Sequence, residues 1–334
     1  MKKRIALLLA ALLAVGSLTA CGGKAGNSGD SVNVGLGLYT QMNSSKGASA
    51  EEEGLAQADL TVAAVTLNAD GTIAAVKVDC IQVKTNFDAT GKITSDTAAE
   101  ILTKREKGND YGMNAVSEIG EWYEQADAFE GFCVGKTIED VKAAMGAEST
   151  PSKDELLAGC TMKINGLVAA LEKACTEAAT GTYTASASDE LNVAITAEVS
   201  SPTDASAEGD GSATAYGNFV AVTSADGAIT SCILDAVQAT VSWDTTGAIT
   251  SDLAVDTTTK YDLKEKYGMT AVSQVGEWYQ QADAFMGYVK GMTADQVAAI
   301  PMDDKTAPTD ENLTAGCTMK IGPYVKVVGK ALAK

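Results

Sequence analysis

The chain has 334 residues and no histidine, and its 25 lysine and arginine residues face 44 aspartate and glutamate residues, for a formal net charge of -19. The lack of histidine excludes imidazole as a catalytic base, as a partner of a serine or cysteine nucleophile, and as a ligand of zinc or haem. A surface this acidic repels phosphate backbones and anionic headgroups, which argues against nucleic acid as a partner and against direct docking on a bilayer.

The first 21 residues predict an export signal. Three basic residues precede an unbroken apolar run over residues 5–15, which is too short to span a bilayer because a membrane helix needs about 20 residues. The sequence LTAC, ending at Cys21, resembles a bacterial lipobox. This resemblance implies removal of residues 1–20 and a diacylglycerol on the Cys21 sulfur, whose two chains suffice for stable anchoring. An ordinary secretory signal with a cysteine there by chance is the alternative.

Cleavage would change the charge and leave a tether. Removing three basic residues from 25 leaves 22, and 22 minus 44 gives the mature chain a net charge of -22. Residues 21–30 are rich in glycine and small polar residues, which is typical of a flexible linker. We therefore expect a protein that is lipid-anchored on the extracytoplasmic face of the cell membrane, with its folded part standing off the surface.

Six cysteines follow Cys21, and they do not form a recognisable framework. No two are spaced CxxC, which disfavours iron–sulfur and zinc-ribbon sites. Six cysteines in an exported protein suffice for three disulfides, yet only Cys160 and Cys317 occupy equivalent positions in the repeat described next. This mismatch favours thiols that are mostly buried and free. The six are at positions 80, 133, 160, 175, 232 and 317.

An internal repeat organises the rest of the chain. Residues 111–137 match residues 267–293 at 18 of 27 positions with an offset of 156, and the heptapeptide AGCTMKI occurs at residues 158–164 and again at residues 315–321. Each unit has about 150 residues, which is long enough to bury its own core. We therefore predict a signal peptide (1–20), a tether (21–30) and two repeat domains (31–180 and 181–334).

The first half of each unit has the pattern of a β-sheet. In the first unit, residues 62–67 and 72–78 flank an Asp-Gly turn and predict a hairpin, and residues 80–87 predict a third strand. Residues 43–54 and 201–217 have the composition of solvated loops.

The second half of each unit has helical periodicity. Apolar residues recur every three or four positions from Ala115 onward, and Thr137 with Asp140 resembles a capping box at the start of a second helix. A last helix is predicted over residues 166–178, and its counterpart over residues 323–332 begins with a proline, which suits a first helical turn. Strands followed by helices predict an α+β fold, in two tandem copies of a small antiparallel sheet with helices.

The repeated heptapeptide lies after the strands and ahead of the last helix, and there it resembles the attachment motif of the FMN-binding domains of exported flavoproteins, such as the C subunit of the sodium-pumping quinone reductase. In that family the motif Ser/Thr-Gly-Ala-Thr ends in the threonine to which a flavin transferase joins the phosphate of FMN. The resemblance implies covalent FMN at Thr161 and Thr318. The segments around YGM and GEWY are also similar to flavin-bearing electron-transfer lipoproteins of Gram-positive bacteria.

Three further pairs of residues are expected to support the cofactor. The glycine before each threonine would let the backbone approach a bulky group. The lysine after it would neutralise the phosphate, together with the start of the closing helix. Tryptophans would contact the flavin ring, although their helical spacing favours core packing. The pairs are Gly159 and Gly316, Lys163 and Lys320, and Trp122 and Trp278.

The favoured function is therefore an electron carrier, not an enzyme with its own substrate pocket, which takes electrons from a membrane donor and passes them to an extracellular acceptor. Two alternatives stay open. The heptapeptide also suits a half-buried strand with an unmodified threonine, in which case the protein is a ligand-binding or scaffold lipoprotein of the cell surface. The signal segment could also serve as the source of a signalling peptide.

Overall fold

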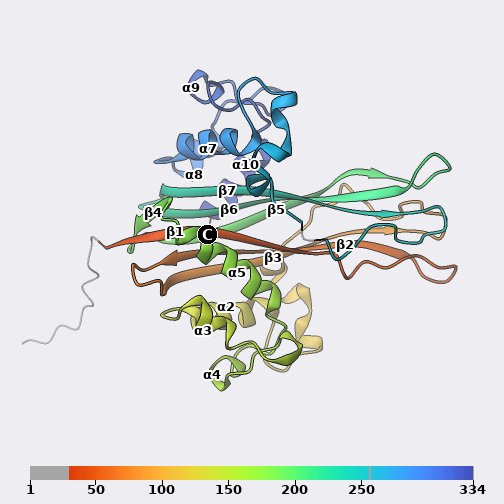
Figure 1. The fold of residues 1–334 in the computed structure, drawn as a ribbon, viewed down its shortest axis with the longest axis horizontal. Coiled ribbons are helices and arrows are strands. Elements are labelled where there is room, and N and C mark those ends of the chain that lie inside the picture. The colour runs from red at the N-terminus through yellow and green to blue at the C-terminus, as the bar shows by residue number, and fades with distance from the viewer. Residues whose placement is uncertain (1–29, 256, 334) are drawn as a thin grey trace, which may run out of the picture.

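The computed structural model describes residues 30–255 and 257–333, and these form four layers (Figure 1). Two antiparallel sheets lie face to face in the middle, and helices cover both outer faces. The helices of the first repeat lie on one side of the sandwich, and those of the second repeat lie on the other. The chain therefore has the mixed α+β architecture that the order of its elements predicts.

The first sheet is a three-stranded meander with one strand added from the second repeat. Its order is β3-β2-β1-β4, and β4 pairs antiparallel with the start of β1. The boundary expected at residue 180 thus falls just before a strand that belongs to the first sheet. The strands are β1 (Ser31–Gln41), β2 (Gly54–Leu67), β3 (Ile73–Phe87) and β4 (Tyr183–Ser186).

Strand β3 is continuous where the sequence suggested two strands. The expected break lies at Asp79, which is only 2% exposed and accepts a hydrogen bond from the Cys80 N–H at 2.7 Å. The carboxylate is satisfied locally, so a buried acidic residue does not interrupt the ladder. The prediction of separate strands over residues 72–78 and 80–87 is therefore wrong.

The second sheet has the order β5-β6-β7 and includes part of a segment expected to be a loop. β6 starts at residue 211, within the expected loop over residues 201–217. Small residues such as Ala213 and Ala215 alternate along it and pack between the sheets, where larger side chains would not be needed. Residues 43–53 do lie outside the strands, as predicted. The strands are β5 (Glu190–Thr203), β6 (Gly211–Ala225) and β7 (Ala228–Trp243).

The two repeats share the core between their sheets through reciprocal contacts. Phe87 and Trp243 occupy equivalent positions, 156 residues apart, and their rings stack on each other with centroids 4.2 Å apart. The Ala48 N–H donates to the Gly247 carbonyl at 2.8 Å, and the Ala205 N–H donates to the Gly91 carbonyl at 2.9 Å. Each repeat also has an outer core between its sheet and its helices.

The helices follow the predicted order in both repeats. The capping box at Thr137 is present, as is its counterpart at Thr293. Pro323 lies in the first turn of α10, as predicted. The first repeat has α1 (Lys104–Lys107), α2 (Trp122–Cys133), α3 (Ile138–Lys142), α4 (Asp154–Leu157) and α5 (Asn165–Ala178). The second has α6 (Lys260–Leu263), α7 (Trp278–Val289), α8 (Ala294–Ala298), α9 (Glu311–Thr314) and α10 (Gly322–Leu332).

Helix α2 begins seven residues later than the periodicity from Ala115 suggested. Gly120 has a φ of 148°, and Glu121 then caps the helix in a capping box. Val116 precedes this break and is 89% exposed, so its apolar spacing is not the buried face of a helix. The expectation of a helix from residue 115 is therefore wrong.

Helix α5 packs tightly on β1 because two glycines face it. A Cβ atom on Gly35 would lie 2.0 Å from the Ala174 carbonyl oxygen, and one on Gly37 would lie 2.0 Å from the Ala170 carbonyl oxygen. No real side chain tolerates such a distance from backbone. This contact fixes the position of α5, and thereby of the AGCTMKI segment that leads into it.

Candidate functional site

The two AGCTMKI segments are loops, each joining a short helix to the closing helix of its repeat. In the first repeat, the side-chain oxygen of Gln125 on α2 accepts the N–H groups of Thr161 at 2.9 Å and Met162 at 3.1 Å. Cys160 and Ile164 are fully buried on either side. The loop is thus fixed at both ends while Thr161 itself is exposed. The alternative of a half-buried strand is wrong.

The second loop is built in the same way. The side-chain oxygen of Gln281 accepts the N–H groups of Thr318 at 2.9 Å and Met319 at 3.0 Å, and Thr318 is exposed. The Thr318 hydroxyl also lies 3.4 Å from the same Gln281 oxygen. Both threonine hydroxyls are therefore placed where a bulky group would meet solvent rather than the protein interior.

Each loop leads to a helix whose first N–H groups lack a side-chain cap. Neither α5 nor α10 has a hydrogen bond from a capping side chain at its start. Lys163 and Lys320 are exposed just ahead of these helix starts. Uncapped N–H groups, the positive end of the helix dipole and an ammonium group together favour an anion.

The glycines of the two loops have a packing role. A Cβ atom on Gly159 would lie 2.7 Å from the Cβ of Ala128 on α2, and one on Gly316 would lie 2.8 Å from the Cβ of Ala284 on α7. The small size of each glycine thus lets the loop rest on the preceding helix. Their expected role in admitting a ligand does not follow from these contacts.

The tryptophans belong to the outer cores, as their helical spacing favours. Trp122 is 4% exposed and Trp278 is 1% exposed. Trp122 also forms part of the wall of a cavity that Lys163 reaches from the loop. Of the expected site residues, Trp122 and Lys163 are therefore brought together at this cavity.

This cavity, which we call the first-repeat hollow, has a volume of about 370 Å³. Lys104 is one of its lining residues, and its Nζ lies 5.4 Å from the centre of the Trp122 ring. Asp59 is held by the side-chain amide of Gln82, which donates to it at 2.8 Å. The hollow thus combines an aromatic wall with two amino groups, a carboxylate and amides. Its walls include Asp59, Gln82, Lys104, Trp122, Lys163 and Leu167.

The equivalent region of the second repeat is filled by tyrosines. Tyr216 stands where the first repeat has Asp59, because each pairs with the corresponding glutamine of the neighbouring strand. Tyr324 stands where the first repeat has Leu167. The Tyr324 hydroxyl accepts from Trp278 Nε1 at 2.9 Å and lies 3.2 Å from the Tyr216 hydroxyl.

Lys260, the counterpart of Lys104, is enclosed by this tyrosine cluster. Its Nζ donates to the Tyr216 hydroxyl at 3.1 Å and lies 4.3 Å from the centre of the same ring. Burial lowers the pKa of Lys260 to about 8, since desolvation disfavours its charged form. The same fold therefore presents an open polar hollow in one repeat and a closed aromatic cluster in the other.

The six cysteines of the described residues are free and buried, as their mismatch between repeats predicts. Burial raises the pKa of Cys160 and that of Cys317 to about 11, so both thiols stay protonated at neutral pH. Neither of these cysteines, each next to its threonine, is therefore poised as a nucleophile. Cys21, the expected lipidation site, lies outside the described residues.

Sequence reasoning missed the residues that shape the hollow and its loop. Gln125 and Gln281 fall inside the best-matched stretch of the repeat, and the pair Thr103-Lys104 recurs as Thr259-Lys260. Recurrence of a polar residue within an apolar helix was the available signal for the glutamines. Nothing in the sequence indicated that Lys104 and Trp122 lie beside the same loop.

Metal-ligand groups, membrane-spanning helices and similarity to known proteins give no functional assignment. Within residues 30–255 and 257–333, no group of three potential metal ligands is brought together, and no helix there is long and apolar enough to cross a membrane. Comparison of the chain with protein-family models, with curated proteins and with solved structures finds no match. The functional assignment therefore depends on the chemistry of the loops and the hollow.

Proposed function

We propose that the chain is a lipid-anchored, extracytoplasmic electron carrier with FMN joined through its phosphate to threonine, and that Thr161 is its preferred attachment point. The observation that carries this proposal is the position of Thr161. Its side chain is exposed on a fixed loop, four residues ahead of an uncapped helix, and Lys163 of the same loop lines a hollow with an aromatic wall. No other exposed threonine of the first repeat combines the loop, the uncapped helix and the hollow.

The residues around Thr161 suit the parts of FMN. Lys163 and the first N–H groups of α5 would hold the phosphate, since both favour negative charge. Trp122 offers part of an apolar wall to a planar ring, and Lys104 and Gln82 offer donors to its polar edge. When bound, FMN would supply reversible electron transfer. A covalent link would prevent its loss outside the cell.

Attachment requires an activated donor, for which a flavin dinucleotide has the right chemistry. The threonine oxygen would form a bond to the phosphorus of the FMN half, and the P–O–P bond would break. The nucleoside monophosphate would leave, and the threonine proton would pass to solvent. A separate flavin transferase is expected to catalyse this step, because the described residues near Thr161 include no histidine or metal site to activate the hydroxyl.

The test is the mass of the mature protein purified from its native host. We expect a gain of one FMN-phosphoryl group on the peptide that contains Thr161, with visible flavin absorbance. Both should be lost in Thr161→Ala, which has no hydroxyl to bear the phosphate. Thr318→Ala is the matched control and should lower loading less. A colourless protein of unmodified mass would overturn the proposal. A diacylglycerol on Cys21, lost in Cys21→Ser, tests the anchor separately.

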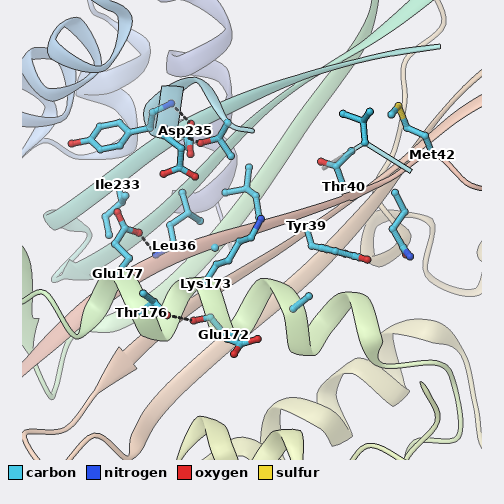
Figure 2. Close-up of a pocket in the computed structure, with 18 of the residues that line it drawn as sticks. Leu36, Tyr39, Thr40, Met42, Glu172, Lys173, Thr176, Glu177, Ile233 and Asp235 are labelled. Atoms are coloured by element: carbon cyan, nitrogen blue, oxygen red, sulfur yellow. Dashed lines mark hydrogen bonds between the residues drawn. The ribbon is translucent and has the colours of Figure 1, made fainter. Parts of the chain in front are cut away.

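A second candidate function, a binding protein of the cell surface, is favoured by a different part of the molecule. A cavity of about 860 Å³ lies between the two repeats (Figure 2), and neither threonine lines it. It does not depend on the flavin.

A further inference from the structure

Each repeat presents an apolar loop to solvent, just ahead of α2 or α7. The loop of the first repeat, which we call the valine loop, covers residues 113–120 with the sequence MNAVSEIG, and its counterpart over residues 269–276 has the sequence MTAVSQVG. Val116 and Val272 are each 89% exposed, while Ile119 and Val275 are 43% and 38% exposed. An exposed side chain contributes little burial, so the stability of the fold does not explain these four apolar residues.

The recurrence of this loop is its informative feature, because single exposed apolar side chains are common on protein surfaces. Three other large apolar side chains are exposed among residues 30–255 and 257–333, and a smaller or polar residue replaces each of them in the other repeat. Leu102 corresponds to Thr258, Val134 to Lys290, and Val255 to Ala99. The apolar character of the valine loop is therefore kept where other exposed apolar positions change.

A buried carboxylate fixes the start of the valine loop. Glu121, which is 1% exposed, accepts the N–H groups of Met113 at 2.9 Å and Asn114 at 3.0 Å. Glu277 accepts the two corresponding N–H groups of the second repeat at 2.7 and 3.1 Å. Because the backbone is held from the interior, the exposed valine has a fixed position, and little conformational entropy is lost when a partner covers it.

The same glutamine holds the valine loop and the threonine loop. The side-chain nitrogen of Gln125 donates to the Ser117 hydroxyl at 2.9 Å and to the Gly120 carbonyl at 3.0 Å, while its oxygen accepts the Thr161 N–H at 2.9 Å. Gln281 joins the corresponding loops of the second repeat in the same way. One carboxamide group therefore lies between the exposed apolar loop and the loop that carries the proposed attachment point.

The valine loop has an acidic rim in the first repeat that its counterpart lacks. Glu118 lies within the loop and Glu124 lies in the first turn of α2, and both are exposed. In the second repeat Gln274 and Gln280 take their places. A partner with basic residues around an apolar pocket therefore favours the first repeat by charge complementarity. This preference agrees with Thr161 as the preferred attachment point.

We propose that the valine loop is the docking surface for the flavin transferase, a protein with an apolar pocket and a basic rim. The pocket would receive Val116 and Ile119, which places the enzyme beside the Thr161 hydroxyl. This inference rests on the proposed function, since it names the surface through which the same threonine is loaded. Of the described residues that line the first-repeat hollow, none belongs to the valine loop, so an enzyme bound there leaves the hollow open to the flavin.

The experiment follows loading in the native host by the mass of the Thr161 peptide at successive times after expression is induced. Val116→Ser removes the exposed apolar group, and we expect the rate of loading at Thr161 to fall by about tenfold, since burial of a valine contributes about that much affinity. Val134→Ser is the matched control, because Val134 is 50% exposed at the far end of α2. It should load at the natural rate, and both variants should unfold in urea like the natural chain.

A second variant tests the acidic rim. Glu118→Gln combined with Glu124→Gln gives the first repeat the residues of the second. Gln280 forms a capping box with Glu277, so a glutamine at position 124 keeps the start of α2. We expect loading at Thr161 to slow by about threefold, because the charges that attract the basic rim of the enzyme are gone.

The outcomes separate this inference from the proposed function. A natural chain without FMN would overturn both. FMN on Thr161 at an unchanged rate in Val116→Ser, or in the double glutamine variant, would overturn the docking surface and leave the electron carrier in place. A purified chain that is a dimer, and that becomes a monomer in Val116→Ser, would assign the valine loop to a second copy and overturn the proposal.

Discussion

The two repeats share a fold and differ where the last helix meets the sheet. Asp59 and Leu167 leave a polar hollow beside Trp122 in the first repeat. In the second, Tyr216 and Tyr324 occupy the same positions and close it. The two tyrosines thus fill in the second repeat the space that is open in the first. The threonine loop alone is therefore a weaker guide to function than the loop together with its hollow.

The largest expected effect tests the packing that fixes the first loop. Gly37→Ala would place a methyl group about 2.0 Å from the Ala170 carbonyl, so α5 has to move. We expect the free energy of unfolding in urea to fall by at least about 3 kcal/mol. Ala194→Gly at the equivalent position of β5 is the matched control and should cost only about 1 kcal/mol. Equal losses would show that both helices pack alike.

The next effect is the pH dependence of the cavity between the repeats. Burial raises the pKa of Glu177 and that of Asp235 to about 7, against ordinary values of 4.5 and 3.8. A carboxyl with a raised pKa stabilises the fold below its unfolded pKa and loses that contribution as pH rises through 7. We expect stability to fall by about 2 kcal/mol between about pH 5 and about pH 7.5.

The control for this dependence is the neutral variant Glu177→Gln, measured by urea unfolding across the same range. It should reduce the fall to roughly half, because the amide has no proton to lose while Asp235 still titrates. Lys260 titrates above this range, with a pKa of about 8, and so does not contribute to the fall. A variant whose stability falls with pH as steeply as that of the natural chain would contradict the assignment.

A smaller effect tests the closed cluster of the second repeat. Tyr324→Phe removes the hydroxyl that accepts from Trp278 Nε1, and the indole N–H is left buried without that partner. We expect a loss of about 1–2 kcal/mol in thermal or urea unfolding. Leu167→Met in the first repeat is a comparable change beside the open hollow and should be nearly neutral. A larger loss of stability for Leu167→Met than for Tyr324→Phe would mean that the hollow is better packed than the cluster.

The smallest effect concerns Lys330, which joins α10 to strand β5 and to the first repeat. Lys330→Met removes the bond to the Ile195 carbonyl and the pair with Glu106, both partly exposed to solvent. We expect a loss of about 1 kcal/mol in urea, reduced further at high salt. A loss that high salt leaves unchanged would contradict a contribution from the pair with Glu106.

Much of the fold could be predicted from the sequence because its signals are local. The Asp-Gly turns, the capping boxes at Thr137 and Thr293 and the proline of α10 depend on neighbours within a few residues. The free cysteines also followed from the sequence, since a mismatch between repeats is visible without a structure. These features need no knowledge of which surfaces meet.

The features that the sequence did not predict depend on contacts between distant segments. Val116 has helical spacing but precedes Gly120, whose backbone conformation ends the pattern. The small residues that begin β6 looked like a loop, because the flat space between two sheets was not anticipated. The hollow needs Lys104 and Leu167 near the same loop. The packing of α5 on β1 places Leu167, and the bridge between Ile81 and Thr103 places Lys104.

The reciprocal bonds between the sheets have a consequence for the history of the chain. Ala48 bonds to Gly247 just as Ala205 bonds to Gly91, and Phe87 stacks on its own counterpart, Trp243. Such contacts are those of an isologous interface, in which one surface meets a copy of itself. A single repeat would therefore form a homodimer through this face. Gene duplication and fusion would preserve that interface while freeing one copy to keep a hollow and the other to fill it.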